Sequence, residues 1–421
     1  MAWHDARLRR IYLRRRVVAL SVVVALVALV AARLDHGSGA GAPTRPGAAL
    51  SRGPDGYAGR GAVRARGSSA AQGAGRTRAL PLSLDQLAGQ RVIYAYSGLM
   101  PPASLLRVIR AGEAAGVILF APNVTSVAQL RAVVDELQGA NARSPVRAPL
   151  LILTDQEGGE VRRLPGAPEL SEREIGQSAD GVSLAGQAGT GAARDLRAAG
   201  VNVNLSPVLD VMRAPGGFID EFHRSYGSDP EAVGRLGSAF IIASQRLGVV
   251  AAAKHFPGLG AARLGQDTDS RPVTLRLPLA TLRGVEEAPY RRAIAAGVKL
   301  VMTSWAMYPA LAPGVPAGLS ARVIEGELRG RLGYRGVTIS DTLSAAALAT
   351  YGSLPQRAVL AARAGADVMI CSAIDGNDDP SDGLAVMRAL ARAIARGQLS
   401  RAAAESAAAR VLGLRTSLGA A

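Results

Sequence analysis

Residues 249–270 read VVAAAKHFPGLGAARLGQDTDS, and this stretch decides the fold. Its first five residues are apolar without alternation, as in a strand that is covered on both faces. Lys254 and His255 end the apolar run, and a Pro-Gly turn breaks the chain directly after them. Asp267 and Asp269 then bring two carboxylates into the same loop. A strand that ends in a cation, an imidazole and a turn predicts polar groups at the rim of a sheet.

Lys254 and His255 also belong to residue types that are scarce in this chain. Lys254 and Lys299 are its only lysines, and only His223 and His255 lie outside the N-terminal region. A Lys beside a His at a strand end therefore suggests a functional site. A buried Lys that pairs with a carboxylate, next to a His that bonds a backbone carbonyl, would give the same pattern. Position alone leaves both interpretations open.

From about residue 85 onward, short apolar runs alternate with amphipathic or Ala-rich segments. The expected strands are 92–97, 117–120, 150–154, 201–207, 249–254, 300–304, 337–340 and 366–371. The expected helices are 104–115, 126–139, 183–199, 230–247, 281–296, 320–330, 355–364, 382–396 and 400–418. Strands that alternate with helices predict a parallel sheet. Eight such units in about 335 residues predict a closed (β/α)8 barrel of the TIM type rather than a doubly wound open sheet.

The charge of the chain lies mainly at its N-terminus. The net charge is +16, and residues 1–80 hold 14 Arg and 3 Asp, a net +11. The basic character is thus not that of a nucleic-acid groove on the folded part. Only 4% of the residues are aromatic, which also argues against base-stacking platforms and a nucleic-acid partner.

The N-terminal 84 residues predict a membrane segment and a linker. Residues 1–35 carry arginines followed by an apolar run at 17–32, which favours an uncleaved signal anchor over a cleaved signal peptide. Either alternative places the rest of the chain outside the cytoplasm, anchored to the cell membrane or secreted. Residues 36–84, rich in Gly, Ala, Arg and Pro, predict a flexible linker. The barrel domain is then expected at 85–421.

Polar side chains recur where five consecutive expected strands end, and the carboxyl ends of barrel strands meet on one face. They include Asp155, Arg163, Asp210, Arg224, Lys254, His255 and Asp341. This mixture of carboxylates and cations suits a polyhydroxylated ligand, and a carboxylate held ionised by nearby cations is the nucleophile of retaining glycosidases. No His/Asp spacing resembles a metal-ligand set, and no loop of the P-loop type is present. We therefore expect neither a metal nor a cofactor.

Six motifs together resemble glycoside hydrolase family 3, in particular its single-domain β-N-acetylhexosaminidase branch. They are DQEGGEVRRLPG (155–166), NLSPVLDV (204–211), RSYGSDP (224–230), KHFPGLG (254–260), SDTL (340–343) and AGADVMI (364–370). DQEGG followed by KHFPG is specific, whereas SDT alone is weak. The resemblance covers about residues 85–418.

The resemblance implies a role for each matching residue. Asp341 would be the nucleophile and would form a covalent glycosyl ester. The residues that would hold the sugar are Asp155, Arg163, Arg224, Lys254 and His255. Asp210 would support the site by direct contact or from behind, although an Asp that only caps its loop fits the sequence equally well.

The chain departs from the family pattern at the acid/base. Where the branch has Asp-Ser-His, this chain has Asp269-Ser270-Arg271, and Arg cannot exchange the proton. Asp267 or Asp269 would replace the His if the loop folds over the site and burial raises the carboxyl pKa. His223 is another candidate, and two solvated turn aspartates with no efficient acid/base are the remaining alternative.

Two functions follow. The first is a retaining hydrolase that removes a β-linked sugar, N-acetylglucosamine by the resemblance, from peptidoglycan-derived substrates. The second is a catalytically weak relative that binds sugar or peptidoglycan at the cell envelope.

Overall fold

The computed structural model describes residues 82–374 and 376–419. The expected membrane segment, and the expected linker up to residue 81, lie outside this part. Among the described residues, no helix combines the length and the apolar character that crossing a membrane requires. The described residues belong to one compact unit.

Eight parallel strands close into a barrel, as the sequence predicts. They are β1 (Val92–Tyr94), β2 (Gly116–Ile118), β3 (Leu151–Thr154), β6 (Val203–Asn204), β7 (Val250–Phe256), β8 (Leu300–Thr303), β9 (Val337–Thr342) and β10 (Val368–Cys371). Each strand pairs with its neighbours in chain order, and β10 pairs with β1 to close the ring. The alternative, a doubly wound open sheet, is thereby excluded. β4 (Gln156–Gly158) and β5 (Val161–Arg162) form a separate antiparallel hairpin, which the sequence did not predict.

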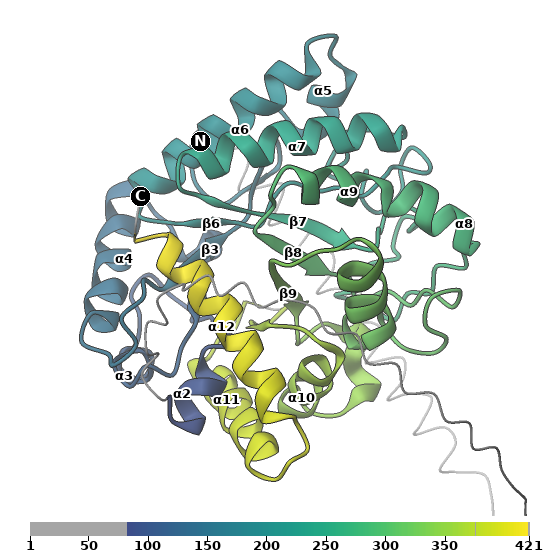
Figure 1. The fold of residues 1–421 in the computed structure, drawn as a ribbon. Coiled ribbons are helices and arrows are strands. Elements are labelled where there is room, and N and C mark those ends of the chain that lie inside the picture. The colour runs from purple at the N-terminus through teal and green to yellow at the C-terminus, as the bar shows by residue number, and fades with distance from the viewer. Residues whose placement is uncertain (1–81, 375, 420–421) are drawn as a thin grey trace, which may run out of the picture. The chain divides into compact units, whose positions relative to one another are not determined.

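Helices surround the barrel, as Figure 1 shows. They are α2 (Leu84–Gly89), α3 (Ala103–Arg110), α4 (Val127–Asn141), α5 (Glu172–Gln177), α6 (Gly181–Ala198), α7 (Pro230–Arg246), α8 (Leu279–Thr281), η2 (Leu282–Glu286), α9 (Ala288–Ala295), η4 (Arg322–Arg331), α10 (Leu354–Ala364), α11 (Pro380–Ala395) and α12 (Arg401–Ser417). Short 3-10 turns lie at η1 (Ala121–Asn123), η3 (Ala317–Leu319) and η5 (Ala346–Tyr351). Most were expected, but α2 and α5 were not.

Alternate strand residues fill the barrel interior because successive side chains of a strand point to opposite faces. Ile93 of β1 and Leu153 of β3 belong to this interior cluster, together with Val411 and Leu414 of α12. The last helix therefore plugs one end of the barrel. The plugged end is the N-terminal one, because Arg415 of α12 bonds the carbonyls that precede β2 and β3.

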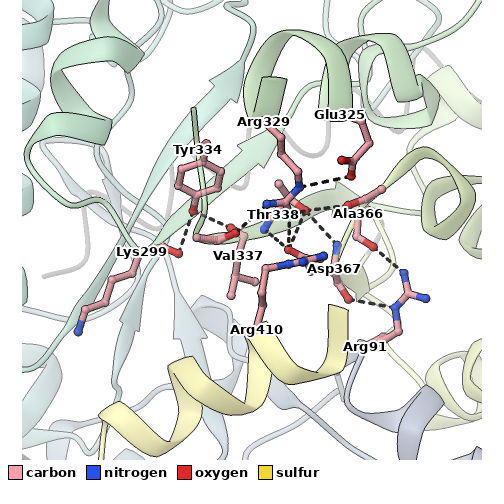
Figure 2. A network of polar contacts seen from close by, with 12 residues as sticks. Arg91, Lys299, Glu325, Arg329, Tyr334, Val337, Thr338, Ala366, Asp367 and Arg410 are labelled. Carbon is pink, nitrogen blue, oxygen red and sulfur yellow. Dashed lines mark hydrogen bonds and ion pairs between the residues drawn. The ribbon is translucent and has the colours of Figure 1, made fainter. Parts of the chain in front are cut away.

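A network of charged side chains ties the strands together at this N-terminal end (Figure 2). Asp367, just before β10, is fully buried and accepts hydrogen bonds from Arg329 at 2.6 Å and from the backbone N–H of Thr338 at 2.9 Å. Its other carboxylate oxygen accepts from Arg410 of α12 at 2.6 Å. One carboxylate therefore joins β9, β10, η4 and α12. The opposite, C-terminal end of the barrel is left for the polar residues singled out above.

Candidate active site

Three polar side chains continue the inward-facing rows of the barrel at its C-terminal end. Along β7, Val250 and Ala252 face the interior, and the next residue in that alternation is Lys254. In β3 the same row runs from Leu153 to Asp155, and in β9 it runs from Ile339 to Asp341. The period of the strands thus brings Lys254, Asp155 and Asp341 to one end of the barrel lumen.

Lys254 lies at the centre of a buried ion cluster. Its ammonium group donates to Asp155 Oδ1 at 2.7 Å and lies 2.7 Å from Glu157 Oε1. Burial disfavours the charged form of Lys254, but Asp155 and Glu157 outweigh it and raise its pKa. An ammonium has three donors, so two are occupied here and one is left for a ligand.

Glu157 also holds Arg224, which arrives from the loop between β6 and α7. Arg224 Nε and Nη2 donate to the two oxygens of Glu157 at 2.8 Å each, a bidentate pair. Burial opposes the ionisation of Glu157, but Arg224 and Lys254 together hold the pKa of its carboxyl well below the usual range. Two cations are therefore oriented by one buried carboxylate.

The β4–β5 hairpin reverses the chain and so brings Arg163 close to Asp155. Gln156 organises the turn, because its side-chain oxygen accepts from the backbone N–H groups of Arg163 and Leu164. Arg163 Nη2 then lies 3.6 Å from Asp155 Oδ2, and Arg163 Nε is buried without a partner. Burial raises the pKa of the Asp155 carboxyl, whereas Lys254 and Arg163 lower it. The net effect is a pKa below the usual value.

His255 points its Nδ1 at Asp210, which is fully buried. Asp210 Oδ2 lies 2.7 Å from His255 Nδ1, and Oδ1 accepts from the backbone N–H groups of His255 at 3.2 Å and Leu259 at 2.6 Å. Asp210 thus caps the turn after β7 and orients the imidazole. In this position Asp210 supports the site from behind His255 and caps the loop, rather than contacting a ligand directly.

Asp341 lies near the end of β9 and is half-buried. Its Oδ1 accepts from the backbone N–H of Thr342 at 2.7 Å. Trp305, which follows β8, is fully buried and donates from its indole N–H to the Thr342 carbonyl at 2.8 Å. Trp305 therefore supports the segment that carries Asp341.

The loop at 261–271 packs against the segment that follows Asp341. The carbonyls of Thr268 and Asp269 accept hydrogen bonds at 3.0 Å from Ala347 and Ala346, the first residues of η5. Asp267 forms the turn, because its Oδ1 accepts from the backbone N–H of Asp269 at 2.9 Å. The two aspartates that the sequence left equivalent therefore differ: Asp267 caps the turn, and Asp269 interacts electrostatically with Asp341, Arg224 and Asp155.

The pKa of Asp269 is shifted in the opposite direction from those of Asp155 and Glu157. Its Oδ1 is buried and has no hydrogen-bond partner among the described residues. Burial, followed by the charges of Asp341 and Asp267, raises the pKa of Asp269 well above its ordinary value. Arg271, which stands in the place of the family His, is exposed. A carboxyl group whose protonated form is favoured by burial, together with a second carboxyl group at Asp341, supplies the two groups that acid/base chemistry requires.

His223 does not join this cluster of contacts. Its Nδ1 lies 4.0 Å from Glu160, and about half of each side chain is exposed. Within the described residues, no group of three or more His, Cys, Asp or Glu side chains is arranged to hold a metal ion.

Sequence reasoning missed Glu157 as a member of the site. A signal was present, because residues i and i+2 of an extended segment point to the same side, so Asp155 and Glu157 face the same neighbours. The motif offered three acidic residues within six positions, and only the fold distinguishes the buried Glu157 from the exposed Glu160.

The fold and this site can be compared with known proteins. The family described as "Glycosyl hydrolase family 3 N terminal domain" matches residues 83–414. The chain belongs to glycosyl hydrolase family 3. It is 44% identical over 344 residues to a secreted glycosyl hydrolase of Arthroderma benhamiae, covering 81% of this chain and 96% of the relative. It is 35% identical over 299 residues to a beta-hexosaminidase of Thioalkalivibrio sulfidiphilus, covering 67% and 82%.

A solved structure of the same family is also similar to this chain. The family 3 beta-N-acetylglucosaminidase of a Paenibacillus species superposes with a TM-score of 0.75 at 36% identity, over 80% of this chain and 63% of that one. The resemblance stated from the motifs is confirmed at the level of the family. This family 3 chain is accordingly a glycosidase, similar to β-N-acetylhexosaminidases.

Proposed function

We propose that this chain is a retaining β-N-acetylhexosaminidase in which Asp341 is the nucleophile and Asp269 is the acid/base. The observation that carries the proposal is the buried Oδ1 of Asp269, which has no hydrogen-bond partner among the described residues, on a loop hydrogen-bonded to the segment after Asp341. Asp269 protonates the leaving oxygen while Asp341 attacks the anomeric carbon and forms a glycosyl ester. Asp269 then removes a proton from water, which attacks the ester and releases the sugar with its configuration retained.

The sugar in this proposal is held by the ion cluster. The free donor of Lys254, the guanidinium groups of Arg163 and Arg224, the carboxylate of Asp155 and the outer nitrogen of His255 bind its hydroxyl groups. Asp210 acts through His255. The similarity to a beta-hexosaminidase and to a beta-N-acetylglucosaminidase supports β-linked N-acetylglucosamine as the sugar. We further propose peptidoglycan-derived substrates.

The proposed location outside the cytoplasm rests on the sequence of residues 1–35. The name of the secreted Arthroderma relative is compatible with it. Membrane anchoring rests on the apolar run at 17–32 alone.

The decisive experiment compares an aryl N-acetylglucosaminide with an N-acetylglucosamine-containing muropeptide disaccharide. We expect Asp341→Ala to abolish the turnover of both substrates. Asp269→Asn should lower kcat for the disaccharide by about 10²–10⁴-fold, the usual worth of a general acid/base. Asp269→Asn should slow the glycosylation of the enzyme by the aryl substrate less than by the disaccharide, because an aryl leaving group needs little protonation.

Asp267→Asn is the matched control, because an Asn at this position keeps the oxygen that caps the turn. It should retain near wild-type turnover of both substrates. Turnover that survives Asp341→Ala would contradict the nucleophile, and equal losses in the Asp267 and Asp269 variants would contradict the acid/base. Measurable sugar affinity without turnover of either substrate by the wild type would instead favour the envelope-tethered binding protein.

A further inference from the structure

One buried carboxyl group near the site has no part in the mechanism above. Glu286, the last residue of η2, has no accessible side-chain surface. Neither of its oxygens receives a hydrogen bond from any described residue. The nearest charged group is Arg213, whose Nε lies 3.8 Å from Glu286 Oε1 and whose side chain is 36% exposed. An ionised carboxylate in such a position would be strongly destabilised.

Glu286 packs beneath the turn that follows His255. A Cβ added to Gly258 would lie 2.8 Å from Glu286 Oε2, so the carboxyl group packs against the backbone of that turn. On the same turn, Asp210 accepts from the backbone N–H of Leu259 and orients His255. Two carboxyl groups from different elements thus support one short segment of the sugar pocket.

Burial, more than the charged groups around it, favours the neutral form of Glu286. The groups that face it are Asp210 and Arg213 in the loop after β6, Tyr290 on α9, and Tyr308 after β8. Burial raises the pKa of Glu286 to about 8, against the lowering effect of Arg213 and with a smaller raising effect of Asp210.

We propose that Glu286 is a positioning residue that must stay uncharged to keep the Asp210–His255 pair in its sugar-binding geometry. The inference rests on the proposed function, because the affected quantity is affinity for the sugar. An ionised Glu286 would place a second negative charge behind the turn, repel Asp210 and draw Arg213 inward.

The test measures the affinity for N-acetylglucosamine by calorimetry at pH 6.5 and pH 9. Binding that requires protonated Glu286 weakens about tenfold for each pH unit above the pKa. We expect the wild-type Kd to rise by about that factor at pH 9. Glu286→Gln, which imitates the neutral acid, should bind equally at both pH values, with the wild-type affinity at pH 6.5.

Two further variants exclude a merely structural role. Glu287→Gln is the matched control, because Glu287 is the buried neighbour that pairs with Arg331 and should leave the pH dependence unchanged. Arg213→Gln removes the cation that lowers the pKa of Glu286, so the loss of affinity should move to higher pH.

The outcomes separate the inference from the proposed function. A wild type that binds no N-acetylglucosamine at pH 6.5 and does not hydrolyse its glycosides contradicts both. A wild type that hydrolyses the substrate but binds the sugar independently of pH contradicts only the role of Glu286. A Glu286→Gln variant that follows the wild-type pH dependence, or that binds poorly at pH 6.5 while folded, contradicts it as well.

Discussion

Glu157 is the buried carboxylate that holds two cations of the ion cluster in place. It accepts a bidentate pair from Arg224 and also contacts Lys254, so both cations depend on one buried carboxylate. Removing one partner of a buried, charged group is costly because the remaining charges are left uncompensated. At the scale of a residue, affinity for the sugar and stability therefore depend on the same contact.

Glu157→Gln should lower the free energy of unfolding at pH 7 by about 3–5 kcal/mol and should raise KM, because Arg224 and Lys254 lose their shared anion. Denaturant unfolding and initial-rate kinetics measure the two effects. The pKa of Glu157 is held well below its usual value, so its stabilising effect is present above that usual value and is lost as the pH falls through the lower pKa of the folded protein. The wild type should therefore lose more stability on acidification than the variant.

Glu160→Gln is the matched control for this prediction, because Glu160 lies in the same motif but is half exposed. It should change the free energy of unfolding by no more than about 0.5 kcal/mol. Equal effects of the two substitutions would contradict the importance assigned to burial.

At the scale of an element, α12 contacts the N-terminal end of the barrel through two arginines, Arg410 and Arg415. Arg415 is fully buried, and its guanidinium pairs with no carboxylate of the described residues. It donates to Gln90, Asn141 and the carbonyls of Ala114, Ala148 and Pro149. These acceptors precede three different barrel strands, so one side chain fixes the helix across the barrel end.

Arg415→Met should lower the free energy of unfolding by at least about 3 kcal/mol, because each buried acceptor left unpaired costs about 1–3 kcal/mol. Chemical denaturation checks the value. Arg401→Met, on the same helix, removes an exposed pair with Glu405 and should cost at most about 1 kcal/mol. A cost for Arg415→Met that is as small as this control would mean that α12 is held by its apolar residues alone.

At the scale of the whole molecule, the two ends of the barrel divide stability from chemistry. Asp367 at the N-terminal end binds Arg329 and Arg410 and lies far along the strands from Lys254, Asp155 and Asp341. In barrels of this kind, catalytic groups gather at the C-terminal ends of the strands. Charged groups at the other end then affect folding without touching the substrate.

Asp367→Asn should accordingly lower the free energy of unfolding by about 3–5 kcal/mol, because the buried Arg329 and the partly exposed Arg410 lose their carboxylate. At a temperature where both proteins remain folded, KM and kcat should keep their wild-type values. Thermal unfolding followed by kinetics on the aryl N-acetylglucosaminide provides the measurement. A rise in KM comparable to that of Glu157→Gln would show that the two ends are coupled.

The sequence by itself determined the closed barrel, the family and the end of the barrel at which the site lies. These follow from local patterns: strand periods, turns after the strands, and motifs within a few residues of one another. Only the tertiary structure decided the surroundings of each acid. Glu157 and Glu160, Asp267 and Asp269, and Glu286 and Glu287 are near neighbours in sequence with the same ionisable group. Burial and the charges of distant segments set them apart, because desolvation and Coulomb interaction depend on distances in space.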